Sequence, residues 1–202
     1  MKVNQIAAIA LASGLSRRMG SENKLLLSFA GRCLFEYTID QIALAGFAEK
    51  IVVANALQIH QYAKERGFLM AQNKEAASGR ASSLQAGILN AADADAYMFF
   101  NCDQPLLGDI TIKKLVAVFE RTDKIIVPKV SDRYGSPCIF PRRFREDLLA
   151  LVGDNGGKIV YRKYPKEVET VDFIDQTDFM DIDRVEDFPI VLEQIKLRDK
   201  NL

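Results

Sequence analysis

Short apolar runs alternate with longer amphipathic stretches along most of the chain. Uninterrupted apolar runs are typical of strands buried on both faces, and apolar residues three or four positions apart are typical of helices packed on a sheet. The pattern predicts strands over residues 5–11, 50–54, 68–72, 96–101, 124–128 and 168–174. It predicts helices over residues 34–45, 58–65, 79–91, 109–121, 142–151, 158–164 and 184–198. This alternation indicates an α/β fold with a mostly parallel sheet and helices on both faces.

The alternation changes in the last third of the chain. Residues 130–140 have the pattern of a small β-hairpin insertion, with a turn at Asp132-Arg133-Tyr134-Gly135. The run Gly153-Asp154-Asn155-Gly156-Gly157 then breaks the chain ahead of the next helix. We find no internal repeat, low-complexity segment or linker, and we therefore expect residues 1–202 to form a single domain.

Composition and charge exclude several classes of protein. The 202 residues are 49% hydrophobic and 27% charged, which is enough to bury one sizeable core. Lys plus Arg and Asp plus Glu number 27 each, so no global charge attracts nucleic acid or an anionic membrane. The chain opens without a signal-peptide layout, and no apolar run reaches the ~18 residues that span a bilayer. We expect a cytoplasmic protein with neither nucleic acid nor membrane as a partner.

Cysteine and histidine usage narrows the chemistry further. Cys33, Cys102 and Cys138 form no CxxC pair, which argues against a zinc site or a disulfide framework. His60 is the only histidine, and this count excludes histidine-dependent triads and multi-histidine metal sites.

The loop over residues 12–24 combines small residues with three cations, Arg17, Arg18 and Lys24. Small residues let backbone N–H groups approach an anion, glycines permit unusual dihedral angles, and the cations can neutralise a polyphosphate. Because the loop follows a strand, we expect it at the carboxyl edge of the sheet, where open α/β folds bind ligands. It fits neither a Walker A loop nor a dinucleotide fingerprint, which disfavours an ATPase and a nicotinamide dehydrogenase. The loop alone is equally consistent with a solvated turn.

Asp103 follows the predicted strand over residues 96–101, at the same sheet edge as the loop. Mg²⁺ prefers oxygen ligands and usually binds through one or two carboxylates together with substrate phosphates. An aspartate at this point can also simply end a strand or cap a turn. Its coincidence with the cationic loop favours the metal-binding interpretation.

Two further carboxylates occur in Met180-Asp181-Ile182-Asp183, just before the last predicted helix. In an extended segment Asp181 and Asp183 point to the same side, so one could reach a metal while the other orients it or caps the helix. The spacing from Asp183 to Glu186 is that of a capping box, so helix capping competes with metal binding.

Other segments are candidate walls of a site. The run Ser78-Gly79-Arg80-Ala81-Ser82-Ser83-Leu84 offers hydroxyl groups and a helix start where a base or a phosphate could approach, although it also fits an ordinary helix start. Gly135-Ser136-Pro137 and the glycine-rich run over residues 153–157 lie in the irregular half, where a second substrate would have to enter. A simple connector is the competing interpretation of that glycine-rich run.

Taken in order, these motifs resemble the MobA-like nucleotidyltransferases, with the closest likeness to the molybdenum cofactor cytidylyltransferases. The resemblance rests on residues 11–20 with Asn23-Lys24-Leu25-Leu26, on Asp103-Gln104-Pro105, and on Asp181-Ile182-Asp183 with Glu186-Asp187-Phe188. It implies a Rossmann-like α/β fold of the nucleotide-diphospho-sugar transferase type. It also implies an enzyme that joins a nucleoside monophosphate from CTP or GTP to the phosphate of molybdopterin and releases pyrophosphate.

The resemblance implies a role for individual residues. Arg18, Lys24 and Asp103 would be catalytic, the two cations holding phosphates and Asp103 binding Mg²⁺ with Asp183 as a second ligand. The implied nucleotide-binding residues are Leu11, Ala12, Ser13, Gly14, Arg18, Lys24, Ser82, Ser83 and Asp103. The implied substrates are CTP (or another NTP) and molybdopterin, with Mg²⁺ as cofactor and a molybdoenzyme or its chaperone as a candidate protein partner.

The predictions of the nucleotide base and of the acceptor substrate depend on fewer positions. Ser13 is the small, non-glycine residue of the cytidylyl branch, and Ser82-Ser83-Leu84 is also closer to that branch, which predicts CTP. Ser136 stands where the branch commonly has histidine, and Arg184-Val185 replaces a usual Thr-Pro. The alternatives are therefore GTP as the donor, or a sugar phosphate or small alcohol phosphate as the acceptor. Two non-catalytic alternatives also remain: a nucleotide-sensing or cofactor-chaperone protein, and a structural interaction domain.

Overall fold

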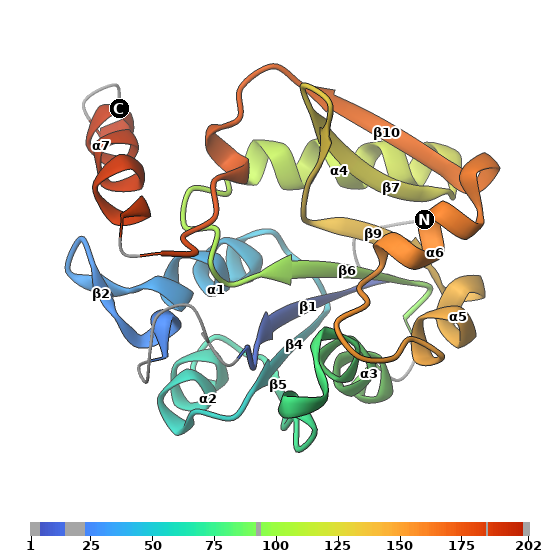
Figure 1. The fold of residues 1–202 in the computed structure, drawn as a ribbon, viewed down its shortest axis with the longest axis horizontal. Coiled ribbons are helices and arrows are strands. Elements are labelled where there is room, and N and C mark those ends of the chain that lie inside the picture. The colour runs from blue at the N-terminus through green and yellow to red at the C-terminus, as the bar shows by residue number, and fades with distance from the viewer. Residues whose placement is uncertain (1–4, 15–22, 92–93, 185, 200–202) are drawn as a thin grey trace.

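One mixed sheet forms the centre of the protein. The computed structural model describes residues 5–14, 23–91, 94–184 and 186–199. In these residues eight strands share a sheet of order β10-β7-β9-β6-β1-β4-β5, with β8 paired to β7 beside this path (Figure 1). The strands are β1 (Ile6–Ala12), β4 (Glu49–Ala54), β5 (Leu69–Ala71), β6 (Ala96–Asn101), β7 (Ile125–Val130), β8 (Arg133–Tyr134), β9 (Cys138–Pro141) and β10 (Val168–Phe173).

Most neighbouring strands in this sheet are parallel. β1 pairs in parallel with β4 and β6, β4 with β5, and β7 with β10. β9 runs antiparallel between β6 and β7, and β8 runs antiparallel to β7. The predicted α/β fold with a mostly parallel sheet is confirmed.

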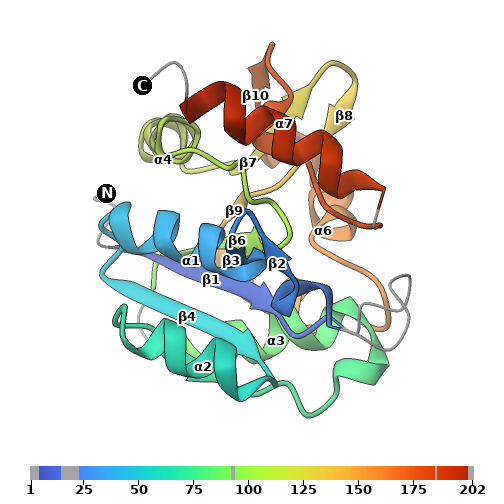
Figure 2. The same ribbon diagram turned by 90° about the vertical axis from the view of Figure 1, so that its left-hand side faces the viewer.

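Helices cover both faces of the sheet (Figures 1 and 2). Along β1, Ala8 and Ala10 belong to one apolar core and Ala7 and Ile9 to the other, as the alternation of side chains in a strand requires. The first core includes buried residues of α1 (Leu34–Leu44), α2 (Leu57–Lys64), α4 (Asp109–Thr122) and α7 (Asp187–Asp199). The second includes residues of α3 (Arg80–Asn90), α5 (Arg145–Leu149) and α6 (Lys158–Lys163).

Short elements differ from the sequence prediction. β2 (Ser28–Phe29) and β3 (Arg32–Cys33) form a separate antiparallel pair that was not predicted, because two residues per strand leave no periodicity to detect. Five 3-10 turns are also present in the described residues: Lys24–Leu26, Ala76–Ser78, Arg142–Phe144, Pro165–Glu167 and Thr177–Phe179.

The hairpin insertion exists, but its predicted turn is misplaced. Arg133 and Tyr134 form β8 and pair with Val130 and Lys129, so the chain turns at residues 131–132. Ser131 takes the positive φ of 54° that this turn needs, whereas the sequence signal had pointed to the later glycine.

Two predicted helices begin later than expected. The helix predicted from residue 142 starts as a 3-10 turn and becomes α5 only at Arg145. The helix predicted from residue 184 starts at Asp187, whose carboxylate accepts hydrogen bonds from the backbone N–H groups of Asp183 (2.8 Å) and Arg184 (2.7 Å). These bonds hold the two residues in a turn before the helix.

The carboxyl ends of β1 and β6 lie side by side. Leu11 is in register with Asn101, and the Cys102 N–H donates to the Leu11 carbonyl at 3.4 Å. On α1, the Thr38 hydroxyl lies 3.4 Å from the Asn101 carbonyl and 3.3 Å from the Gln104 carbonyl. The loops after the two strands therefore share one edge of the sheet. In the part of the chain that the structure describes, none of the helices combines the length and apolar character needed to cross a bilayer.

Candidate active site

Lys24 joins two distant carboxylates at this edge. Its ammonium donates to Asp103 Oδ2 at 2.8 Å, to Asp183 Oδ1 at 3.0 Å and to the Ile182 carbonyl at 2.8 Å. The lysine lies in the first turn after the N-terminal loop, where the Asn23 side chain accepts from the Leu25 N–H at 3.1 Å. Burial alone would lower the pKa of Lys24, but Asp103 and Asp183 outweigh it and raise that pKa. Lys24 is therefore a cation at neutral pH.

The segment before α7 is fixed alongside Asp103. The Ile182 N–H donates to the Asp103 carbonyl at 2.9 Å, and the Ile182 side chain is fully buried. The flanking Asp181 and Asp183 remain accessible to solvent. The Asp183 carboxylate binds Lys24, and the Asp187 carboxylate accepts from the backbone N–H groups of Asp183 and Arg184.

Asp181 titrates unusually because of its surroundings. Desolvation by the neighbouring protein atoms and the negative charges of Asp103 and Asp183 raise the pKa of Asp181 to about 7, although Lys24 and a hydrogen bond from Gln104 oppose the shift. Three carboxylates thus share a small region with one ammonium group. Such crowding of like charges disfavours the ionised carboxylates, and a further cation bound among them would relieve it.

The residues at this edge fit a divalent cation that also binds phosphates. Asp103 Oδ1 is buried and has no hydrogen-bond partner among the described residues, so one carboxylate oxygen is left for another ligand. Within the described ranges, no three His, Cys, Asp or Glu side chains are arranged to hold a metal by themselves. Asp103 and Asp183 would therefore supply part of a coordination shell that substrate oxygens complete, as is usual for Mg²⁺.

A buried polar cluster lies at the end of β1. The hydroxyl oxygens of Ser13 and Ser83 are 2.8 Å apart, and Asn73 Nδ2 lies within 3.1 Å of the hydroxyl oxygens of Ser13, Ser82 and Ser83. The Glu75 N–H donates to Asn73 Oδ1 at 3.1 Å, which orients the amide so that its NH₂ group faces the serines. The structure thus brings together the three serines that the sequence analysis assigned to the nucleotide.

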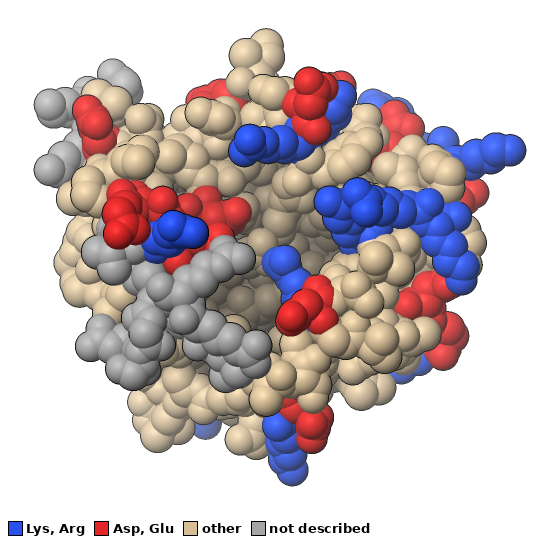
Figure 3. All heavy atoms as spheres, viewed as in Figure 1, with Lys and Arg blue, Asp and Glu red and all other residues tan. Residues whose placement is uncertain are grey.

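A cavity of about 850 Å³ opens beside the carboxylates. Its lining includes Leu11 and Asn101 from the sheet edge, Asp181 and Asp183 from the segment before α7, and Ser136 from the hairpin. Figure 3 shows it as a hollow with acidic side chains toward α7 and Lys or Arg side chains toward α6. Both runs that were expected to admit a second substrate, residues 135–137 and 153–157, contribute to this lining, the first through Gly135 and Ser136 and the second through Asp154, Gly156 and Gly157.

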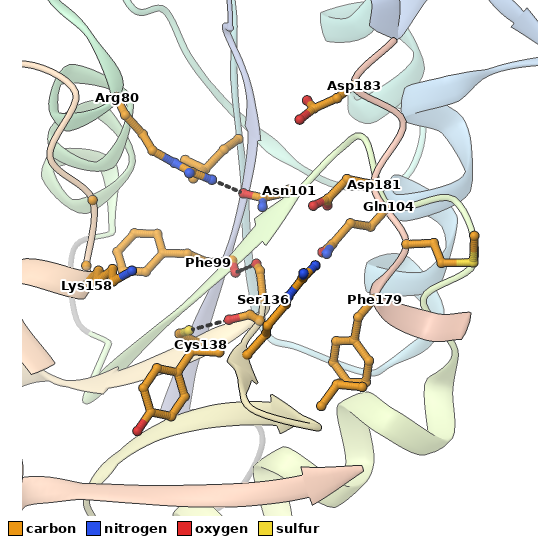
Figure 4. A pocket seen from close by; sticks show the side chains of 18 of the residues that line it. Arg80, Phe99, Asn101, Gln104, Ser136, Cys138, Lys158, Phe179, Asp181 and Asp183 are labelled. Carbon is orange, nitrogen blue, oxygen red and sulfur yellow. Dashed lines mark hydrogen bonds between the residues drawn. The ribbon is translucent and has the colours of Figure 1, made fainter. Parts of the chain in front are cut away.

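Opposite the carboxylates, the chain around Gly79 and Gly157 is closely packed. A Cβ on Gly157 would lie 2.5 Å from the Phe140 ring, and a Cβ on Gly79 would lie 2.4 Å from the Gly153 backbone. The Ser136 hydroxyl donates to the Phe99 carbonyl at 3.3 Å (Figure 4). Burial raises the pKa of the Cys138 thiol to about 12, so this cavity residue is not a thiolate nucleophile at neutral pH.

The structure places most of the predicted site residues at one edge. Leu11 and Ala12 end β1, and Ser13 and Gly14 directly follow it. Ser82 and Ser83 lie in the first turn of α3, and Lys24 contacts both predicted metal ligands. Arg18, and Arg17 with it, lie outside the described residues. Cys33, Cys102 and Cys138 are free thiols in this structure.

Sequence reasoning missed residues that complete the site. Asn73 is 3% exposed and organises the serine cluster, but it stands alone in a polar loop and no motif marks it. Gln104 is 2% exposed, lines the cavity and has a buried Oε1 without a partner in the described chain. Its position directly after Asp103 was a usable signal. Arg80 was quoted only as part of a helix start.

Comparison with known proteins gives a family match. A model of the MobA-like NTP transferase domain matches residues 8–168. A molybdenum cofactor guanylyltransferase of Shewanella baltica is 30% identical over 180 residues, which cover 86% of this chain and 88% of that protein. Nicotine blue oxidoreductase of Paenarthrobacter nicotinovorans is 28% identical over 191 residues, which cover 90% and 93%.

Solved structures share the fold. A nucleotidyl transferase from Methanothermobacter superposes with a TM-score of 0.81 at 21% identity and covers 97% of this chain and 99% of that chain. Rv0371c from Mycobacterium tuberculosis, in a complex with manganese, superposes with a TM-score of 0.75 at 22% identity and covers 95% and 100%. At these identities the structures establish the architecture alone.

Proposed function

The chain belongs to the MobA-like NTP transferase family, and from this premise we propose that it transfers a nucleoside monophosphate from an NTP to the phosphate of molybdopterin. Pyrophosphate is the second product. The observation that carries the proposal is the convergence of Lys24 on Asp103 and Asp183, 79 and 159 residues away along the chain, beside an open cavity. A cytoplasmic location and a molybdoenzyme or its chaperone as the recipient of the product remain expectations from the sequence.

The proposed step is an in-line displacement at phosphorus. An oxygen of the acceptor phosphate forms a bond to the α-phosphorus of the NTP, and the bond to the bridging oxygen breaks as pyrophosphate leaves with the electron pair. The attacking phosphate is already ionised, so the step needs no strong general base, in agreement with a chain that has one histidine. The work of the protein is alignment and charge neutralisation.

Each residue at the edge has a part in that work. Lys24 stays protonated because of its carboxylate partners, and it would hold a phosphate oxygen in exchange for one of its three present contacts, with Arg18 as its expected companion. Asp103 and Asp183 would hold Mg²⁺, which supplies positive charge against the triphosphate when it is bound. The end of β1 and the serine cluster would hold the nucleoside.

CTP is the donor in this proposal. Ser13 keeps a hydroxyl at the end of β1, where it bonds with Ser83 and Asn73, and this choice of residue supports a cytidylyl enzyme. The name of the Shewanella relative makes GTP the competing donor. The name of the Paenarthrobacter relative illustrates that one fold hosts different reactions, so the product has to be identified directly.

The test is pyrophosphate release with CTP, GTP, ATP and UTP in the presence of molybdopterin and Mg²⁺. We expect release with CTP above the other three, and we expect Asp103→Asn to lower the rate about a hundredfold or more, because a preorganised charge contact is lost. Asp109→Asn removes an exposed carboxylate that pairs with Lys113 and serves as the matched control with unchanged rate.

Each other outcome contradicts a stated part of the proposal. A preference for GTP would overturn the donor, and release only with a sugar phosphate or alcohol phosphate would overturn the acceptor. NTP binding by calorimetry without release from any acceptor would favour the nucleotide-sensing or chaperone alternative. Full turnover in Asp103→Asn would remove Asp103 from the mechanism.

A further inference from the structure

Charged residues of both signs line the cavity, among them Arg133, Asp154, Arg184 and Asp187. Four others name its two sides, Arg80 and Lys158 the basic side and Asp181 and Asp183 the acidic side. In Figure 4, Arg80 and Lys158 lie on one side of the pocket, and Asp181 and Asp183 lie on the opposite side. The acidic side is the one assigned above to Mg²⁺ and the triphosphate. The basic side has no role in that assignment.

The position of Arg80 is fixed by its neighbours. It is the first residue of α3, and the Ala81 N–H donates to the Gly153 carbonyl at 3.0 Å, which ties the helix start to the glycine-rich run. A Cβ on Gly156 would lie 3.4 Å from Arg80 Cδ, so the stem of the arginine runs past this glycine. Its guanidinium donates to Asn101 Oδ1 at 2.8 Å, at the end of β6 and two residues before Asp103.

Neither cation forms an ion pair within the described part of the protein, although Asp154 also lines the cavity. In that part no carboxylate lies within 4.0 Å of the Arg80 guanidinium or the Lys158 ammonium, whereas Lys24 has two such partners. The bond to Asn101 uses one N–H of the five that a guanidinium offers. The remaining donors, in a planar fork, match a phosphate or a carboxylate.

The proposed reaction creates a need for cations at this place. The acceptor phosphate has to approach the α-phosphate of the NTP, so two anions meet next to the carboxylates of the acidic side. Positive groups fixed on the acceptor side offset this repulsion and align the attacking oxygen.

We propose that Arg80 and Lys158 form the subsite for the terminal phosphate of the acceptor. This inference rests on the proposed function and deepens it, because it makes the acceptor a phosphate monoester and assigns its phosphate to the side of the cavity opposite Asp181 and Asp183. The two residues are specificity-determining groups for the acceptor and not for the NTP.

The experiment compares Arg80→Met, Lys158→Met and Arg80→Lys with the wild type. Arg162→Met is the matched control, because it removes an exposed cation of α6 that is absent from the lining residues of the cavity. We expect the two methionine variants to raise KM for molybdopterin about tenfold to a hundredfold, as for the loss of a charged hydrogen bond, with KM for CTP changed less than about twofold. Arg80→Lys should recover part of the loss.

Outcomes that overturn the subsite differ from those that overturn the function. An unchanged KM for molybdopterin in both methionine variants, or an equal rise in KM for CTP, overturns it. If the wild type transfers no nucleotide, inorganic phosphate is titrated into all the proteins in Mg²⁺-free buffer and binding is followed by phosphorus NMR. Weaker binding in Arg80→Met and Lys158→Met alone supports the subsite, and equal binding in every protein or none in the wild type overturns it.

Discussion

At the scale of single residues, the site combines cationic and acidic side chains, and the sequence identifies some of them as candidates. Lys24 and Asp103 could be chosen from the sequence because each lies in a loop that follows a predicted strand, where open sheets bind ligands. Asp183 could be chosen only through the family resemblance, because helix capping explains its position equally well. Asn73 could not be chosen, since its role depends on three hydroxyl groups that approach it only in the folded chain. Arg80 could not be chosen either, because only the folded chain brings its guanidinium into hydrogen-bond contact with Asn101.

Asn73→Asp tests whether the serine hydroxyls contact the nucleotide. An aspartate accepts hydrogen bonds where the asparagine NH₂ donates, so the hydroxyl protons of Ser13 and Ser83 turn toward it and away from a ligand. We expect KM for the NTP to rise about tenfold, the cost of roughly one hydrogen bond. Steady-state kinetics measure this, and Asn90→Asp at the exposed end of α3 is the control. An unchanged KM in a folded variant would separate the cluster from nucleotide binding.

Asp181→Asn tests the crowding of carboxylates through pH. Because the pKa of Asp181 is raised to about 7 in the folded protein, from an ordinary value of 3.8, the folded state holds an extra proton between these values. Stability is therefore lost as the pH rises through this window, and the neutral asparagine avoids the loss. In metal-free buffer we expect the variant to be more stable by about 1 kcal/mol at pH 8, after allowance for solvent screening, and equal near pH 4. Thermal unfolding at the two pH values measures this, and the same difference at both would contradict it.

At the scale of elements, the periodicity of apolar residues predicted the long strands and helices. Local contacts determined where some elements begin and where the chain turns. The bounds of β6 and the start of α1 are as predicted, because both elements have clear apolar patterns. The start of α7 moved to Asp187 through side-chain hydrogen bonds that no pattern reveals. The turn before β8 was misplaced because Ser131 adopts a conformation that sequence signals assign to glycine.

Gly79→Ala tests how the start of α3 is held against the glycine-rich run. Gly79 has a φ of +104°, which strains the backbone of an alanine, and an added Cβ would lie only 2.4 Å from the Gly153 backbone. Both effects destabilise the folded state of the variant. We expect a loss of about 2–4 kcal/mol in the free energy of unfolding, measured in urea. Gly46→Ala has a similar φ of +80° with no atom within 4 Å, and it should lose about 1 kcal/mol. Equal losses in the two variants would show that the Gly79 contact is unimportant.

At the scale of the whole molecule, the fold positions the site by bringing chain ends of parallel strands together. β1 and β6 are neighbours although 83 residues separate the end of β1 from the start of β6, and their loops carry Lys24 and Asp103 to one edge. The sequence predicted this edge because parallel strands present their carboxyl ends together. It did not predict how the last third of the chain returns, as β7, β9 and the segment before α7, to close a cavity over it.

The central claim is that Asp103 and Asp183 share one divalent cation with the triphosphate. The most direct measurement is a crystal of the protein grown with Mn²⁺ and α,β-methylene-CTP, in which anomalous scattering locates the manganese. We predict a manganese peak in contact with both Asp103 and Asp183 and with oxygens of the analogue, at about 2.0–2.3 Å. Manganese bound elsewhere, or a nucleotide whose phosphates lie away from these carboxylates, would contradict the account.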